Sequence, residues 1–164
     1  MSNFGLDETI GAHGGKVLRT KVGDRYVIEK MVEQNLHVGG EQSGHIIFRE
    51  YATTGDGIVS ALQILRIMQA TGKPLSELKR VLNKYPQAQR NLRVKTKPPL
   101  DELTDVMKLV GQAESELSGK GRVLLRYSGT EPKIRLLIEG REFSQIDGHA
   151  SRIAEAIENA IGAK

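Results

Sequence analysis

Apolar residues recur along this chain with two different periods, and each period predicts a different kind of element. After Asp24, Asp56 and Asp101, and again from residue 144 onward, they recur every third or fourth residue. This spacing predicts amphipathic helices, because such residues share one helix face. Over residues 133–139 the alternation has a period of two and follows an apolar run, which predicts two β-strands joined by a polar turn.

Residues that interrupt regular structure cluster in the middle of the chain and predict a domain boundary. We expect a small α/β layer domain over residues 1–72, with a short strand at 16–20, and a linker with a short helix over 73–84. A C-terminal α+β domain over 85–164 should follow, built from an antiparallel sheet with two helices. The interrupting residues are Gly72, Pro74, Pro86, Pro98 and Pro99.

Composition narrows the class of ligand and partner. The chain has 164 residues, a net charge of +4 and a pI near 9.4, which favours anionic partners. Basic residues are dispersed and aromatic residues amount to only 4%, so stacking platforms for nucleic acid are few. We therefore expect a small phosphorylated ligand and no nucleic acid. The lack of cysteine and of any membrane-length apolar run favours a cytoplasmic protein without a membrane partner.

The polar turn between the two predicted strands carries groups suited to phosphate. Arg126 and Arg135 lie near the strand ends, where guanidinium groups bind phosphate oxygens in pairs. Ser128 and Thr130 add hydroxyl donors, and Gly129 can adopt a positive φ that turns backbone N–H groups toward one anion. A loop of solvated charges would explain the glycine but not two arginines and two hydroxyls beside one turn. We therefore predict a phosphate-binding loop.

A second glycine-rich segment, residues 39–45, carries polar side chains suited to a sugar. Glu41 and Ser43 are one residue apart, so in an extended segment both project to one side and can bond neighbouring hydroxyls. Its glycines would permit close backbone approach. On these residues alone, a glycine-rich hairpin with solvated polar groups is the more common arrangement.

Other polar residues have ordinary structural interpretations. Asp24 and Asp56 precede predicted helices, where a carboxylate accepts hydrogen bonds from the first turn. His13, His37 and His149 have no polar partner near them in sequence, and we predict all three at the surface.

Both polar loops resemble loops of one enzyme family. Residues 126–132 resemble the Arg-x-Ser-Gly-Thr-Glu-Pro phosphate-binding loop of the α-D-phosphohexomutase superfamily. Residues 40–45 are similar to its Gly-Glu-x-Ser-Gly-His sugar-binding loop, and the two loops occur in the family's order. Residues 21–27 and 53–57 resemble further family segments, most closely those of bacterial phosphoglucosamine mutases. The resemblance spans nearly the whole chain.

The resemblance implies both an activity and residue roles. Such enzymes interconvert glucosamine 6-phosphate and glucosamine 1-phosphate on the route to amino-sugar and cell-wall precursors. They use an N-terminal phosphoserine, Mg²⁺ and a glucosamine 1,6-bisphosphate intermediate. Arg25, Glu41 and Ser43 would contact the sugar substrate, and His45 would either assist proton transfer or act as a structural donor. The residues implied to bind the phosphate are Arg126, Ser128, Gly129, Thr130 and Arg135.

The family's serine and Asp-Gly-Asp-x-Asp-Arg metal loops have no match in this sequence. Residues 1–6 resemble the opening of the family's third domain, so we expect a C-terminal half with the first strand of that domain cut off. Mg²⁺ would then bind to the N-terminal domains, which would be this chain's partners, and the chain alone would be inactive. A phosphoglucomutase or phosphomannomutase fragment, or a non-catalytic sugar-phosphate-binding module, are the alternatives.

Overall fold

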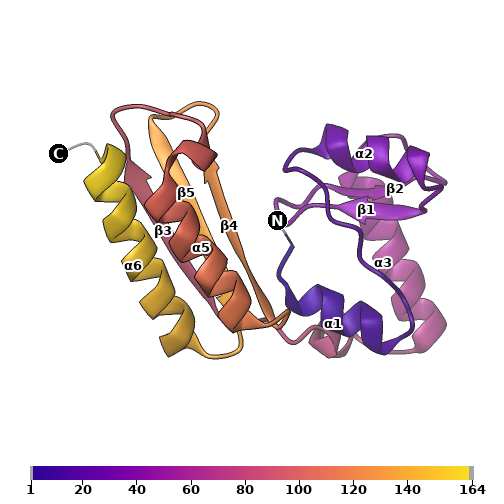
Figure 1. The fold of residues 1–164 in the computed structure, drawn as a ribbon. Coiled ribbons are helices and arrows are strands. Elements are labelled where there is room, and N and C mark those ends of the chain that lie inside the picture. Colours follow the sequence, from indigo (N-terminus) through magenta and orange to yellow (C-terminus); the bar gives the residue numbers. More distant parts are fainter. Residues whose placement is uncertain (1, 163–164) are drawn as a thin grey trace. The chain divides into compact units, whose positions relative to one another are not determined.

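The computed structural model, which describes residues 2–162, divides into two units, Met1–Lys84 and Tyr85–Lys164 (Figure 1). The first unit combines helices with a two-stranded antiparallel sheet, and the second places two helices on a three-stranded antiparallel sheet. The predicted fold class, a small α/β unit followed by an α+β unit, is confirmed.

The first unit is built around a short hairpin. Strands β1 and β2 pair in antiparallel register, with Val38 opposite Phe48. Helix α2 packs close to this hairpin because Gly39 has no side chain, and a Cβ there would lie 2.7 Å from Val27. The elements are α1 (Gly5–Ala12), α2 (Asp24–Glu33), β1 (Val38–Gly40), β2 (Ile46–Phe48), α3 (Gly57–Thr71), α4 (Leu75–Leu78) and the 3₁₀ helix η1 (Lys79–Val81).

Two helix starts in this unit differ in how they are capped. Asp56 accepts hydrogen bonds from the N–H groups of Ile58 and Val59, at 2.8 and 2.9 Å, so its predicted role as an N-cap is confirmed. The prediction for Asp24 is wrong, because Gly23 occupies the N-cap position and Asp24 is the first helical residue. Gly23 has φ 132°, a left-handed conformation that glycine adopts without strain.

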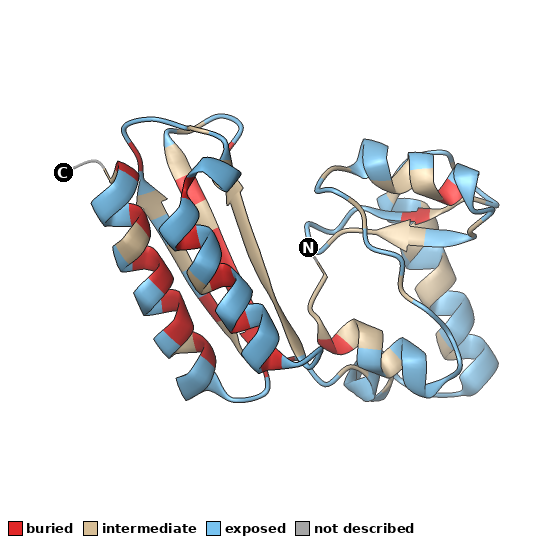
Figure 2. Cartoon of the chain, viewed as in Figure 1, coloured by how far each residue is buried: buried red, intermediate tan, exposed pale blue. Residues whose placement is uncertain are grey.

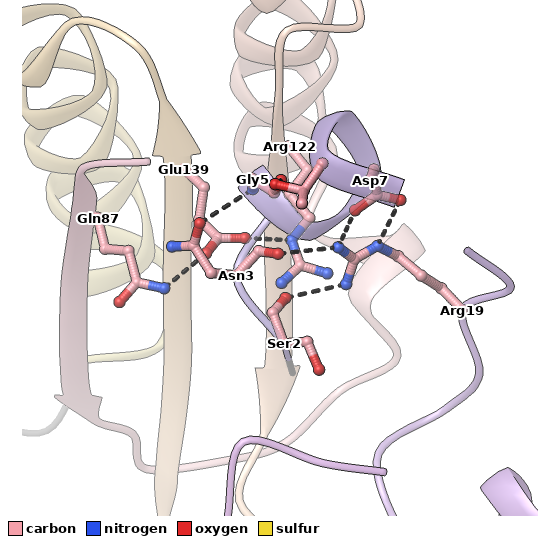
Figure 3. Close-up of polar contacts among 9 residues, drawn as sticks. Ser2, Asn3, Gly5, Asp7, Arg19, Gln87, Arg122 and Glu139 are labelled. Carbon is pink, nitrogen blue, oxygen red and sulfur yellow. Dashed lines mark hydrogen bonds and ion pairs between the residues drawn. The ribbon is translucent and has the colours of Figure 1, made fainter. Parts of the chain in front are cut away.

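The strand predicted over residues 16–20 is absent, and these residues are irregular. In the described part of the chain β1 and β2 pair only with each other, so no ladder reaches this segment. Its conformation is fixed instead by Arg19, which donates to the carboxylate of Asp7 at 3.2 Å and to the carbonyl of Ser2 at 3.0 Å (Figure 3). A short run of β-prone residues is therefore insufficient for a strand when no partner edge is available.

The second unit has β5 as the central strand of a sheet with the order β3-β5-β4. Helices α5 and α6 cover one face, and Figure 2 shows their buried residues as stripes along one side of each helix. The elements are β3 (Gln87–Arg93), the 3₁₀ helix η2 (Leu100–Glu102), α5 (Thr104–Leu117), β4 (Gly121–Tyr127), β5 (Lys133–Gly140) and α6 (Phe143–Ile161).

The core of this unit lies between the helices and the even-numbered residues of β5. Ile134, Leu136 and Ile138 are almost fully buried against Val106 of α5 and Ile157 of α6. Each such side chain stabilises the fold by roughly 1.5–3 kcal/mol relative to leaving it exposed. This packing supports the hairpin of β4 and β5, which the sequence predicted correctly.

The opposite face of the sheet carries the odd-numbered residues of β5, which are charged except for the buried Leu137. Glu139, which has no exposed surface, lies in register between Gln87 of β3 and Arg122 of β4. Its carboxylate accepts a hydrogen bond from each of them at 2.5 Å, as Figure 3 shows. The pairing compensates for the desolvation of a buried charge and ties the three strands together.

His149 is buried, with 3% of its surface exposed, so its predicted surface position is wrong. It lies on the buried face of α6, three residues after Ile146 and four before Ile153, which the helical period places on one side. Its Nε2 lies 3.3 Å from a carboxylate oxygen of Glu116, and Arg152 donates to its Nδ1 at 2.9 Å. The surface predictions for His13 and His37 are confirmed.

Candidate functional site

The predicted phosphate loop is the turn between β4 and β5, residues 128–132. The N–H of Ser128 donates to the carbonyl of Lys133 at 2.8 Å, which closes the hairpin immediately beyond the last strand pair. The carbonyl of Pro132 accepts from the N–H of Val94 at 3.0 Å, so the far side of the turn is tied to the end of β3. Both ends of the loop are therefore held by the sheet.

Arg126 and Arg135 lie directly opposite each other on β4 and β5, on the face away from the helices. Directly opposed residues of antiparallel strands have Cβ atoms about 4.5–5.5 Å apart, and like charges in such pairs are destabilising. A bound dianion would relieve this repulsion. The Nε of Arg135 is buried without a hydrogen-bond partner in the described structure.

Glu131 supplies an internal counter-charge within the loop. Its carboxylate accepts hydrogen bonds from Lys133 at 2.5 Å and from Arg135 at 3.0 Å. The hydrogen bond from Lys133, and after it that from Arg135, lowers the pKa of Glu131. Glu131 therefore neutralises part of the positive charge that Lys133 and Arg135 bring to this loop.

The middle of the loop presents open backbone. Ser128 is buried, with 4% of its surface exposed, whereas Gly129 and Thr130 are exposed. No hydrogen-bond acceptor among residues 2–162 takes the N–H of Gly129 or of Thr130. Two backbone donors thus lie in the turn between the strands that carry Arg126 and Arg135.

The expectation that Gly129 adopts a positive φ is wrong, because this residue is not among the positive-φ glycines. The closure between Ser128 and Lys133 forms the turn without a left-handed residue there. Gly129 is instead unpacked on its side-chain side, since a Cβ built on it would have no other heavy atom within 4 Å. Its missing side chain leaves the backbone open to an approaching ligand.

Lys97 also contacts this loop, although it lies outside the sequence motifs described above. Its ammonium group donates to the carbonyl of Ser128 at 2.7 Å. The two residues are separated by 31 positions in the sequence, so no local pattern indicated the contact.

The predicted sugar loop is a tight turn between β1 and β2, so the extended conformation expected for Glu41 and Ser43 is wrong. The N–H of Gly44 donates to the carbonyl of Glu41 at 3.1 Å, and the N–H of Glu41 donates to the carbonyl of His45 at 2.9 Å. Packing explains Gly40, because a Cβ there would lie 2.8 Å from the carbonyl oxygen of His45.

Side chains of the sugar loop are partly engaged with the protein. Glu41 accepts a hydrogen bond from the N–H of Gly23 at 3.0 Å, which brings the loop to the start of α2. The hydroxyl of Ser43 lies 2.9 Å from Nδ1 of His45, and both residues are exposed. Arg25, in the first turn of α2, is exposed and pairs with Glu29 at 2.8 Å. Glu41 thus ties the sugar loop to the start of α2, the helix that carries Arg25, and Ser43 and His45 contact each other within the loop.

Comparison with known proteins gives a consistent result for both units. Residues 1–85 match the family model for phosphoglucomutase/phosphomannomutase, alpha/beta/alpha domain III, and residues 90–156 match the model for the C-terminal domain. The phosphoglucosamine mutase of Syntrophotalea carbinolica is 49% identical over 164 residues, covering 100% of this chain and 36% of the relative. That of Nitratidesulfovibrio vulgaris is 51% identical over 161 residues, covering 98% and 36%. The chain therefore spans about 36% of the length of these relatives.

Solved structures support the fold. A crystal structure of N-acetylphosphoglucosamine mutase from Aspergillus fumigatus superposes with a TM-score of 0.73 at 21% identity, covering 99% of this chain and 38% of that protein. A phosphoglucomutase/phosphomannomutase family protein from Burkholderia thailandensis gives a TM-score of 0.69 at 21% identity, covering 96% and 36%.

Proposed function

Because the chain belongs to the phosphoglucomutase/phosphomannomutase family, we propose that it supplies the substrate-binding part of a phosphoglucosamine mutase. The intact enzyme would interconvert glucosamine 6-phosphate and glucosamine 1-phosphate through a phosphoserine and a glucosamine 1,6-bisphosphate intermediate. A cytoplasmic location and a role in cell-wall precursor synthesis belong to the same proposal.

The observation that carries the proposal is the cross-strand pair of Arg126 and Arg135 beside a turn in which the backbone of Gly129 and Thr130 is exposed. A mutase of this kind must hold the phosphate that is not reacting while the other end of the sugar reacts. Such a clamp needs many donors and no nucleophile, so that it positions the substrate without attacking it. Arginine forks, hydroxyls and backbone N–H groups meet this requirement.

The sugar loop would bind the ring. Glu41 bonds to Gly23 through Oε1, which leaves its second carboxylate oxygen to accept from a sugar hydroxyl. Ser43 would orient His45 through their 2.9 Å contact, so that the free face of the imidazole meets the reacting end. Arg25 would exchange its exposed contact with Glu29 for the substrate.

The described residues do not fit the Mg²⁺ that members of this family use. Across residues 2–162, no group of three or more His, Cys, Asp or Glu side chains is arranged to hold a metal ion. We therefore assign Mg²⁺ and the phosphoserine to N-terminal domains of the same enzyme, which are the proposed partners of this chain.

Calorimetric titration of the chain with glucosamine 6-phosphate tests the proposal. Arg126→Ala should weaken binding roughly ten- to a hundredfold, because a charge-assisted hydrogen bond contributes ~1.5–3 kcal/mol. Arg80→Ala is the matched control, since it removes an exposed arginine from the other unit. Equal affinity in all three proteins would refute the clamp.

Two further measurements define the activity and specificity. With glucosamine 6-phosphate, Mg²⁺ and a bisphosphate activator, the purified chain should give no glucosamine 1-phosphate in a coupled assay, because it supplies no phosphoryl carrier. Sustained turnover would contradict this assignment of the catalytic groups. Tighter binding of glucose 6-phosphate than of glucosamine 6-phosphate would favour the phosphoglucomutase alternative.

A further inference from the structure

Lys97 contacts the phosphate loop from outside the loop's own hairpin. It lies in the connection between β3 and η2, and its Nζ donates to the carbonyl oxygen of Ser128 at 2.7 Å. The connection itself is anchored, since the N–H groups of Val94 and Lys95 donate to the carbonyls of Pro132 and Ile161 at 3.0 and 2.9 Å. Two prolines follow Lys97 and restrict the backbone further. The backbone that carries the Lys97 ammonium group is therefore restrained on both sides of Lys97.

This contact determines the direction of the next N–H group. The peptide bond is planar and trans, so the carbonyl of Ser128 and the N–H of Gly129 point in opposite directions. The N–H of Ser128 is already fixed by Lys133, which leaves the Ser128–Gly129 peptide as the first unit of the loop able to rotate. Holding its carbonyl on the side of Lys97 turns the Gly129 N–H to the other side.

Gly129 makes such a constraint necessary. A flip of this peptide would move Gly129 toward positive φ, which glycine adopts at little cost. A Cβ built on Gly129 would have no heavy atom within 4 Å apart from its chain neighbours, so no packed side chain restrains this residue. In the observed conformation φ at Gly129 is not positive, and its N–H has no acceptor among residues 2–162. The contact from Lys97 favours one of two accessible orientations.

We propose that Lys97 is a positioning residue for phosphate recognition, which aims the Gly129 N–H at the bound anion by holding the Ser128 carbonyl. The inference deepens the proposed function and rests on it. If Lys97 acts by orienting the peptide, its effect on phosphate affinity should persist at high salt. An effect due only to attraction between its charge and the anion would be screened there.

The test compares four variants with the wild-type chain. Lys97→Met removes the donor and the charge, and Lys97→Arg keeps both. Lys120→Met makes the same change in net charge at the opposite end of β4, and Arg126→Ala reports on the clamp. Two quantities are measured in each protein: the NMR resonances of the Ser128 carbonyl carbon and the Gly129 amide without ligand, and the Kd for inorganic phosphate at low and high salt.

Lys97→Met should shift the Ser128 and Gly129 resonances before any ligand is added, and should weaken phosphate binding roughly tenfold. The ratio of the Kd values of Lys97→Met and the wild type should be the same in 0.5 M salt, where charges are screened over a few ångströms. Lys97→Arg should restore most of the affinity, and Lys120→Met should change it less than about twofold.

Three results would overturn the inference. Unchanged Ser128 and Gly129 resonances in Lys97→Met would show that the tether does not hold the peptide. If Lys97→Met shifts the resonances but binds phosphate as tightly as Lys120→Met does, the contact is purely structural. If the affinity loss in Lys97→Met disappears at high salt, Lys97 acts through its charge alone. If Arg126→Ala binds phosphate as the wild type does, the proposed clamp itself fails, while the ligand-free resonances still report on the tether.

Discussion

Two glycine-to-alanine changes in the second unit should separate binding from stability. The same methyl group is added at Gly129 in the phosphate loop and at Gly140 at the end of β5. At Gly129 it would meet no heavy atom within 4 Å, and φ there is not positive. At Gly140 it would lie 2.6 Å from Cγ2 of Ile146 and 2.9 Å from Cδ2 of Leu117, closer than packed atoms allow.

The expected magnitudes have opposite signs. Gly129→Ala should stabilise the chain by about 0.4–1 kcal/mol, because alanine reduces the entropy of the unfolded state without straining the folded one. For a unit of this size that corresponds to roughly 2–8 °C in Tm. Gly140→Ala should destabilise it by about 1–3 kcal/mol, the usual cost of overpacking a core.

The effects on phosphate affinity should be the reverse of the effects on stability: the stabilised variant should bind more weakly, and the destabilised variant should bind normally. Alanine at position 129 should weaken phosphate binding roughly ten- to a hundredfold, since it holds the anion away from the loop's N–H donors. Gly140→Ala should keep wild-type affinity at temperatures where it is folded. Urea unfolding and calorimetry on both variants give the comparison. Wild-type affinity in Gly129→Ala would refute the argument that the open backbone receives the ligand.

Three further changes test other parts of the structure. Arg122→Met should lower the free energy of unfolding by about 3–5 kcal/mol in urea, because it removes the guanidinium that pairs with the fully buried carboxylate of Glu139; a loss below about 1 kcal/mol would contradict this. The lowered pKa of Glu131 means that its ionised form stabilises the fold above the ordinary value of 4.5, and that this contribution is lost as pH falls through the lowered value. Urea midpoints of Glu131→Gln and the wild type should therefore converge at low pH, and a difference independent of pH would exclude the effect. Limited proteolysis should cut first between residues 72 and 86, whereas a single resistant core spanning both sides would count against two units.

The local pattern predicted the elements that are stabilised by local contacts. The alternation over residues 133–139 gave the central strand correctly, and Asp56 was identified as an N-cap because the carboxylate bonds within its own turn. Residues 16–20 were predicted wrongly since a strand depends on a partner edge, which no short window of sequence contains. His149 was misplaced because its partners Glu116 and Arg152 are brought to it by helix packing and by the helical turn.

In the candidate site, too, features set by local sequence were predicted and features set by the fold were not. The residue types around the turn at 126–135 predicted a phosphate loop, and strand register then placed Arg126 opposite Arg135. The sequence predicted Gly129 as a left-handed turn residue, but in the structure its φ is not positive and its missing side chain leaves the backbone open. Its φ depends on how the loop closes, which the residue type alone does not determine. Lys97 was missed because 31 residues separate it from Ser128 and only the fold of the β3–η2 connection joins them.

The most direct test of the account is a crystal structure of this chain with glucosamine 6-phosphate bound. It should place the phosphate group on the N–H groups of Gly129 and Thr130, within hydrogen-bond distance of the Arg126 guanidinium, with the Lys97 contact to Ser128 retained. A phosphate bound elsewhere, with the loop of residues 128–132 unoccupied at saturating ligand, would contradict the central claim that this turn is the phosphate clamp of a sugar-phosphate mutase.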